Sequence, residues 1–254
     1  MIRFASLGSG SSGNALVVQA GSTSVLVDCG FTIQETLARL ARLGLTPADL
    51  DGLLITHEHG DHIGSSAALA RRYRLPAYMT PGTRLAARDA RYPTLNEFRG
   101  EEPVRMGDLE VRPFTVPHDA REPSQFVFHD GDHRLALLTD AGHVSPHMIA
   151  CVDGVDGILI ECNHDPALLA AGPYPPALKR RVGGPYGHLS NAAATQLLQA
   201  IDRARLQHVI GMHLSARNNT PELAREALAA GLDCTPEEVV LATQADGFAW
   251  REIR

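Results

Sequence analysis

The sequence lacks the features of a membrane protein or an exported one. No apolar run approaches the ~20 residues that a membrane-spanning helix requires. The chain opens with MIRFASLGSGSSGN, which has no basic segment followed by a long apolar stretch. The four cysteines are scattered and form no C-x-x-C pair, a usage typical of reduced thiols. We therefore expect a cytoplasmic protein with no membrane association.

Lysine is almost absent, because Lys179 is the only lysine among 23 basic residues. The net charge is −6, so the chain is not a polycation that coats nucleic acid unselectively. An acidic partner would have to be held by a local basic patch or by metal. With 254 residues and 44% hydrophobic content, the chain is long enough to bury a substantial core. No internal repeat divides it, and we expect a single domain over residues 1–254.

Short apolar runs alternate with amphipathic ones, which predicts strands and helices in an α/β arrangement. Strands are expected at 15–19, 24–28, 52–56, 134–140, 157–161 and 208–213, and helices at 33–44, 65–74, 191–206 and 220–231. Thr220 is the expected N-cap of the last helix, and Gly231 is its expected terminator. Residues 109–139 alternate as antiparallel strands do, and the Pro/Gly-rich segment 170–187 is expected to be a surface excursion.

Several of these apolar runs end in a metal-ligating or acidic side chain. The residues are Asp28, His57, Asp140, Glu161 and His213. Polar groups gathered at strand ends lie on one rim of a sheet, where a rigid scaffold positions them beside loops. The pattern therefore predicts one active site assembled from distant parts of the sequence.

The segment LLITHEHGDHIG, residues 53–64, has the highest density of metal-ligating side chains. His57 and His59 are two apart in an extended segment, so their side chains share a face and can bind one metal ion. Asp61 and His62 follow at the start of a helix, and we expect them to bind a second ion. Imidazole and carboxylate ligands favour zinc, with manganese or iron as alternatives.

The HEHGDH sequence resembles the signature of the metallo-β-lactamase fold. The resemblance extends to VPHDA, LTDAG and GMHLS, and it implies a four-layer αββα sandwich with mixed sheets and a dinuclear site. By this resemblance, one ion is bound by His57, His59, His118 and Asp140, and the other by Asp61, His62, Asp140 and His213. Asp140 would bridge the two ions, and Asp28 would orient a ligand histidine.

The fold hosts many reactions, so the branch depends on the site. Class B β-lactamases are disfavoured, because Asp140 occupies the position where the common forms carry cysteine. Flavodiiron oxygen reductases are disfavoured, because they typically have an acidic residue at the position of His59. The segments SLGSGSSGN, ECNHD, GHLSN and HLSARNNTP resemble those of the WalJ (YycJ) branch, whose members are described as double-strand DNA 5′ exonucleases. Asp140 and His213 lie too close in sequence for the inserted specificity domain that ribonuclease J carries.

The resemblance implies a phosphodiesterase that uses two divalent ions, zinc or manganese. The ions would lower the pKa of a bridging water and supply hydroxide for in-line attack on phosphorus. His188, paired with Glu161, is the expected general acid, and Asp61 completes the predicted catalytic set. Two other functions stay open: a hydrolase of small esters, thioesters or cyclic phosphodiesters, and a metal-binding scaffold without turnover.

Substrate contacts are expected from three segments of the chain. The candidates are Ser11, Ser12, Asn14, Ser215, Asn218, Lys179 and Arg181. The N-terminal loop of small residues offers backbone N–H groups to a phosphate, or it forms an ordinary turn. Ser215 and Asn218, which follow His213 in the segment HLSARNNTP, suit phosphate contacts or helix caps. The basic run 179–181 either clamps DNA phosphates or ends a helix in solvent. His164 and Asp119 are further candidates, for substrate contact and for support of His118.

Overall fold

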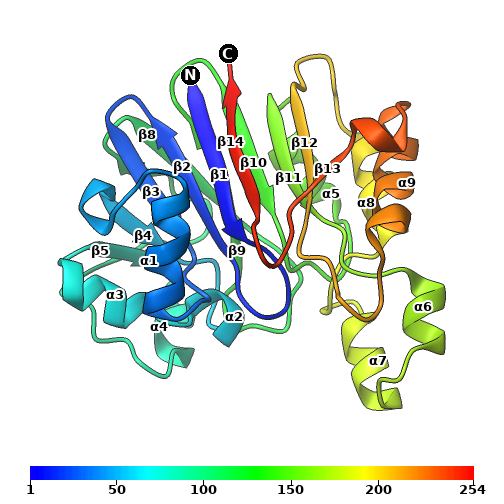
Figure 1. Cartoon of the computed structure of the whole chain (residues 1–254), viewed down its shortest axis with the longest axis horizontal. Coiled ribbons are helices and arrows are strands. Elements are labelled where there is room, and N and C mark those ends of the chain that lie inside the picture. The colour runs from blue at the N-terminus through cyan, green and yellow to red at the C-terminus, as the bar shows by residue number, and fades with distance from the viewer.

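The computed structural model describes residues 1–254 and has two seven-stranded sheets packed face to face (Figure 1). The first sheet has the order β14 (Phe248–Ile253), β1 (Ile2–Gly8), β2 (Ala15–Ala20), β3 (Thr23–Val27), β4 (Gly52–Leu54), β5 (Pro76–Met79) and β6 (Thr94–Glu97). The second has the order β13 (Val240–Leu241), β12 (His208–Met212), β11 (Gly157–Glu161), β10 (Arg134–Leu138), β9 (Ser124–His129), β8 (Leu109–Thr115) and β7 (Val104–Met106). Each sheet contains parallel and antiparallel pairs.

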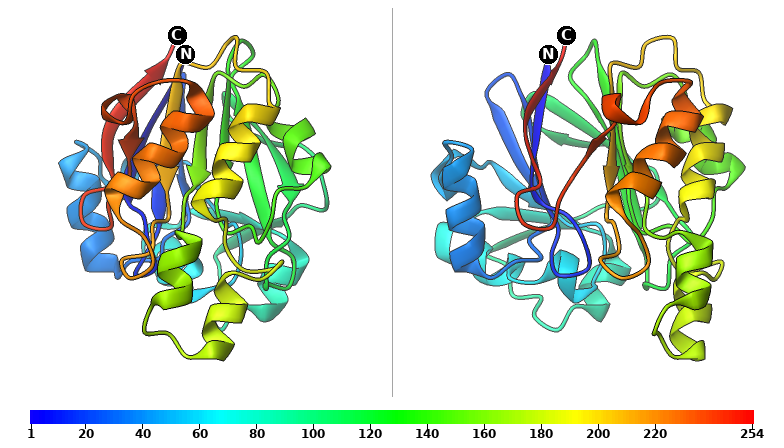
Figure 2. Two further views of the ribbon diagram at one scale, coloured as in Figure 1. Left: turned by 90° about the vertical axis from the view of Figure 1, so that its right-hand side faces the viewer. Right: turned by 45° about the vertical axis from the view of Figure 1, so that its right-hand side comes forward.

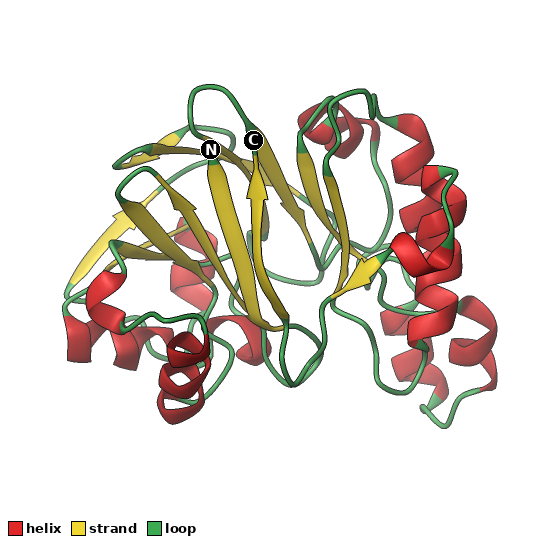
Figure 3. Cartoon of the chain, turned by 45° about the horizontal axis from the view of Figure 1, so that its top comes forward, coloured by secondary structure: helices red, strands yellow, loops and turns green.

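Helices cover both outer faces of the two sheets (Figure 2, Figure 3). The first sheet is covered by α1 (Ile33–Arg42) and α3 (Ser66–Tyr73), and the second by α5 (Pro146–Val152), α8 (Asn191–Ala200) and α9 (Pro221–Leu232). Toward one end of the sandwich lie α2 (Gly60–Ile63), α4 (Pro81–Ala86), α6 (Pro166–Ala171) and α7 (Pro176–Val182) (Figure 1). The predicted αββα sandwich with mixed sheets is confirmed. None of these helices has both the length and the apolar character to cross a membrane.

Strand side chains alternate between the layer that joins the sheets and the layers under the helices. In β10, Leu135 and Leu137 pack between the sheets, whereas Ala136 and Leu138 pack under the helices. The alternation follows from the pleat of a strand. Because both faces of the central strands are buried, their sequences are continuously apolar, which is why the apolar runs located them.

Two helix ends differ from the sequence prediction. The helix expected at 191–206 ends at Ala200, because Ile201 is extended, with a ψ of 155°, and buries its side chain. Gly231 lies inside α9, so its prediction as the terminator is wrong. A Cβ at Gly231 would lie 3.1 Å from the Cβ of Leu198, so glycine here permits close packing of α8 and α9. Asp233, with a φ of 57°, ends the helix instead.

The segment 170–187 projects from the end of the sandwich, as the sequence predicts (Figure 1). It is not an irregular connector, however, because it contains α7, none of whose residues is buried. The basic run 179–181 therefore lies on a short helix. The antiparallel arrangement predicted for 109–139 is present as the pairs β8–β9 and β9–β10.

Candidate metal centre

Strand ends bring the predicted site residues to one end of the sandwich. Asp28 directly follows β3, His213 directly follows β12, Asp140 lies two residues beyond β10, and Glu161 is the last residue of β11. Asp28, Asp140 and His213 have positive φ angles of 60°, 53° and 54°. Such a conformation costs a non-glycine residue on the order of 1–3 kcal/mol. The fold thus holds these three side chains in place against a local backbone cost.

Three histidine nitrogens converge to form a first candidate ion site. His57 Nε2 lies 3.0 Å from His59 Nδ1, which lies 3.2 Å from His118 Nε2. Ligands at about 2.0–2.1 Å from a tetrahedral zinc ion lie roughly 3.3 Å from one another. His118 Nδ1 donates a hydrogen bond to the carbonyl of Gly187 at 2.9 Å, which directs its Nε2 toward the other two nitrogens. The spacing and orientation of the three rings fit one ion.

A second group of ligand atoms faces the first across Asp140. Asp61 Oδ2 lies 3.6 Å from His62 Nε2 and 3.5 Å from His213 Nε2. Asp140 Oδ2 lies 3.0 Å from His62 Nε2, and its Oδ1 lies 3.9 Å from His118 Nε2. One carboxylate therefore reaches both groups, as a bridging ligand must.

Two buried polar atoms at the centre of the cluster, Asp140 Oδ2 and His213 Nε2, form no hydrogen bond. A buried donor or acceptor without a partner costs ~1–3 kcal/mol, so each requires an explanation. Coordination of divalent ions satisfies both atoms, and the imidazole and carboxylate donors suit such ions. These histidine and aspartate clusters are typical of a dinuclear metal site.

Asp28 is placed to orient two of the histidines. His62 Nδ1 donates to Asp28 Oδ2 at 2.8 Å. His57 Nδ1 donates to Thr56 Oγ1 at 3.0 Å, and the Thr56 hydroxyl donates to the same Asp28 oxygen at 2.8 Å. With Nδ1 engaged as a donor, each ring presents the lone pair of Nε2 to a metal. No sequence motif marks Thr56, and only the fold connects it to Asp28.

Glu161 is fully buried, and its carboxylate accepts four hydrogen bonds. Oε1 accepts from His188 Nδ1 at 2.8 Å and from His213 Nδ1 at 3.1 Å. Oε2 accepts from the backbone N–H groups of Ala141 and Leu189, both at 3.0 Å. Glu161 was predicted to pair with His188 alone, but it also bonds to the predicted metal ligand His213 and to two loops of the site.

These contacts determine the charges in the site. Burial lowers the pKa of His188, but the charges and hydrogen bonds of Glu161 and Asp140 together outweigh burial and raise that pKa above its usual value. Burial raises the pKa of Asp140, but the charges of His213 and His62 hold it well below its usual value. The site thus keeps its carboxylates ionised and stabilises positive charge among them, which is the field that a divalent cation requires.

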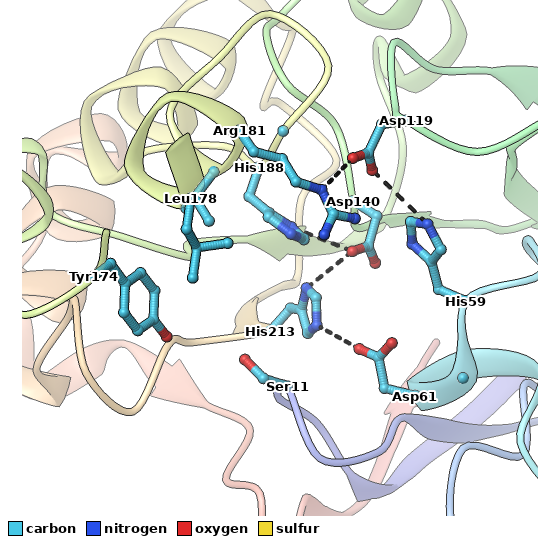
Figure 4. A pocket seen from close by; sticks show the side chains of 13 residues that line it. Ser11, His59, Asp61, Asp119, Asp140, Tyr174, Leu178, Arg181, His188 and His213 are labelled. Carbon is cyan, nitrogen blue, oxygen red and sulfur yellow. Dashed lines mark hydrogen bonds and ion pairs between the residues drawn. The ribbon is translucent and has the colours of Figure 1, made fainter. Parts of the chain in front are cut away.

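The cluster opens into a hollow of about 360 Å³, which we call the metal hollow (Figure 4). Arg181 lines it and pairs with Asp119, whose Oδ1 lies 3.6 Å from His118 Nε2. Tyr174 and Leu178 form part of the wall beside these groups (Figure 4). Neither residue carries ligand chemistry, and only the positions of α7 and of the loop before it bring them to the site, so no sequence pattern marks them.

The predicted substrate contacts fall into two groups. Those that line a hollow are Ser11, Arg181 and Lys179. Asn14, Ser215 and Asn218 are buried, and their side chains form hydrogen bonds within their own turns. Asn14 Nδ2 also lies 3.2 Å from His62 Nε2. Asn14 Oδ1 accepts from Ser9 Oγ at 3.0 Å, and Ser215 Oγ accepts from the backbone N–H of Asn218 at 3.2 Å.

The turn-forming alternative is therefore favoured over substrate contact for Asn14, Ser215 and Asn218. Ser12 is exposed, and its backbone N–H is already engaged with the side chain of Gln244 at 2.8 Å. His164 is buried beside the site and lines a second hollow. Cys29 and Cys162 are buried.

Comparison with known proteins places this geometry in a family. The model of the metallo-β-lactamase superfamily matches residues 8–160. Exodeoxyribonuclease YycJ of Bacillus anthracis is 37% identical over 91% of this chain and 89% of its own length. Exodeoxyribonuclease WalJ of Streptococcus pneumoniae is 36% identical over 87% of this chain and 85% of its own length.

A solved structure shows the same fold at low sequence identity. Zn(2+)-bound PqqB of Methylobacterium extorquens superposes with a TM-score of 0.74 over 98% of this chain and 99% of its own, at 17% identity. The chain belongs to the metallo-β-lactamase superfamily and is a metal-dependent hydrolase.

Proposed function

We propose that the protein is an exodeoxyribonuclease that removes nucleotides from the 5′ ends of double-stranded DNA. Two relatives that align with 91% and 87% of the chain carry exodeoxyribonuclease in their names. The observation that carries the proposal is the hydrogen bonding and position of the His188 side chain. Glu161 holds its Nδ1, its Nε2 bonds to no protein group, and the ring lines the metal hollow.

A proton donor of this kind distinguishes two kinds of leaving group. A thiolate leaves a thioester without assistance, because thiols have a pKa of about 8.5. A sugar alkoxide is far more basic and needs a proton as its bond to phosphorus breaks. The position of His188, beside the ligand clusters and open to the hollow, therefore favours phosphodiester over thioester hydrolysis.

The ligand clusters support a site for two ions. One ion would be held by His57, His59, His118 and Asp140, and the other by Asp61, His62, Asp140 and His213. When bound, zinc or manganese supplies a hydroxide nucleophile at neutral pH and neutralises charge on the phosphate. Both ion sites and the proton donor come from one sandwich, so a single domain suffices for the reaction.

The residues of the chain supply the remaining steps. Hydrolysis forms a bond from the water oxygen to phosphorus and breaks the bond from phosphorus to the 3′-oxygen. The Nε2–H of His188 gives its proton to that oxygen. The charge of Glu161 raises the pKa of His188, so the ring carries this proton at neutral pH. The products are a terminal nucleotide with a free 3′-hydroxyl and a shortened strand with a new 5′-phosphate.

The test is incubation of metal-loaded protein with end-labelled duplex DNA, single-stranded DNA, RNA and a generic thioester. We expect release of labelled mononucleotides from the 5′ ends of the duplex. Asp140→Ala should abolish this release, and Arg251→Ala, an exposed substitution on β14, should leave it unchanged. Rapid thioester cleavage with every nucleic acid intact would refute the proposal.

A further inference from the structure

A second hollow adjoins the metal hollow at His188. Its volume is about 410 Å³, and its lining includes His164, Lys179, Arg180, Gly183, His188 and Ser190. His188 lines both hollows, so the two meet at its ring. In the proposed reaction His188 protonates the 3′-oxygen of the leaving nucleotide. The second hollow also borders His188, so it is placed to bind that nucleotide.

The two hollows differ in charge. Three carboxylates line the metal hollow, whereas none lines the second hollow. Lys179 and Arg180 line the second hollow without a carboxylate partner, in contrast to Arg181, which pairs with Asp119. The ammonium group of Lys179 donates one hydrogen bond to the carbonyl of Ala170 and has two further donors. In a protein of net charge −6, a hollow with two cations and no acid favours an anion.

His164 distinguishes this hollow from an ordinary basic surface. Its side chain is 4% exposed, and its Nδ1 is buried without a hydrogen bond. Nε2 has no protein partner either, and it lies 3.9 Å from where a Cβ on Gly183 would be, so it faces the hollow that both residues line. Buried imidazoles normally have partners. Burial lowers the pKa of His164, so the ring is neutral at pH 7 and has one N–H to offer a ligand.

We propose that the second hollow binds the 5′-phosphate of the leaving nucleotide through Lys179, Arg180 and the Nε2–H of His164. The inference rests on the proposed function, because the direction of cleavage decides which nucleotide leaves. A terminal phosphate carries a charge of about −1.5 to −2 at pH 7, whereas a phosphate inside the strand carries a single negative charge. Two unpaired cations therefore stabilise a strand end more than a strand interior, which makes this hollow a determinant of end selectivity.

The experiment compares kcat/KM on duplexes that carry either a 5′-phosphate or a 5′-hydroxyl at the cleaved end. We expect the unmodified protein to prefer the phosphorylated end by about 10-fold or more, because each charge-assisted hydrogen bond contributes roughly that factor. The double substitution Lys179→Ala with Arg180→Ala should bring the ratio close to one. Arg251→Ala removes an exposed arginine outside both hollows and should keep the preference. Hydrolysis of bis(p-nitrophenyl) phosphate, which has no terminal phosphate, reports on the metal centre itself and should be the same in Arg251→Ala and the unmodified protein.

His164→Phe tests the buried imidazole separately. The His164 side chain forms no hydrogen bond with the protein, so phenylalanine keeps its shape and leaves no protein group unpaired. We expect a melting temperature at or above that of the unmodified protein, together with a reduced preference for the phosphorylated end. A structural role for His164 would instead lower the melting temperature and leave the preference unchanged.

A binding measurement separates failure of this inference from failure of the proposed function. Calorimetric titration should show thymidine 5′-monophosphate binding to the unmodified protein more tightly than thymidine, with the difference lost in the double variant. If this holds while no DNA is cut, the hollow is a phosphate site in an enzyme of another specificity. The inference is overturned if the double variant keeps the end preference or binds the mononucleotide as tightly as the unmodified protein does.

Discussion

Glu161→Gln is the substitution whose effect the structure specifies most closely. The side-chain oxygen of glutamine has to face the backbone N–H groups of Ala141 and Leu189, because these donors are fixed by the chain. The amide NH2 group then takes the place of Oε1, which accepts from His188 at 2.8 Å and from His213 at 3.1 Å. Two acceptor contacts become donor–donor contacts in a fully buried position.

His213 can relieve this conflict only by moving its proton from Nδ1 to Nε2, and His188 only by losing the proton on Nδ1. For His213, Nε2 is the atom that faces Asp61 Oδ2 at 3.5 Å in the second ion site, so the shift removes a metal ligand. Loss of such an orienting partner lowers metal affinity by about 10–100-fold. General-acid catalysis contributes about 10²–10⁴-fold to kcat, and Glu161→Gln removes a charge that keeps His188 protonated. We therefore expect a fall in kcat of about 10²–10⁴-fold that persists at saturating metal.

The assay is hydrolysis of bis(p-nitrophenyl) phosphate at increasing metal concentration, with metal content measured in parallel. Glu110→Gln is the matched control, because Glu110 pairs with Arg112 on β8 at 2.7 Å and lines neither the metal hollow nor the second hollow. It should leave both kcat and metal content unchanged. Unaltered kcat and metal affinity in Glu161→Gln would refute the assignment of Glu161 as the shared acceptor.

Three further substitutions and one treatment test other parts of the site. Asp140→Ala should reduce metal content below two ions per chain and abolish activity, as measured by elemental analysis and DNA digestion. His188→Ala should keep its metal but slow turnover by about 10²–10⁴-fold. A general acid acts in its protonated form, so kcat of the unmodified protein should fall as pH rises through the raised pKa of His188, and the pH profile of His188→Ala should lack this fall. Asp28→Asn should weaken metal binding by about 10–100-fold in chelator competition. Chelation should lower the melting temperature, because ions at about 100 times their Kd stabilise the folded state by ~2.7 kcal/mol.

The local sequence was sufficient to predict the positions of site residues where their spacing along the chain alone decides the geometry. His57 and His59 are two apart after a buried strand, and the structure places their facing nitrogens 3.0 Å apart. The strand-end pattern located Asp140 and His213 because the central strands are buried on both faces and their apolar runs are easily recognised. The αββα fold followed from the family signature, since periodicity alone predicts only alternating strands and helices.

The sequence was insufficient to predict the role of a side chain whose partners lie far away in the chain. Asn14 and Ser215 carry groups that suit a phosphate, but in the fold these groups are engaged in the turns that shape the site. The hydrogen bond between His213 and Glu161 joins residues 52 positions apart, and no local sequence pattern predicts it. The end of α8 at Ala200 depends on where Ile201 finds a buried position, which is a tertiary effect.

The proposed function requires two ions, held at one end of the sandwich, that drive hydrolysis of DNA from its 5′ ends. The most direct test is titration of the metal-free protein with zinc or manganese while release of labelled nucleotide from a 5′-labelled duplex is followed. We predict no release without metal and a rate that saturates at two equivalents per chain. Full activity at one equivalent, or metal-loaded protein that leaves every duplex end intact, would contradict this account.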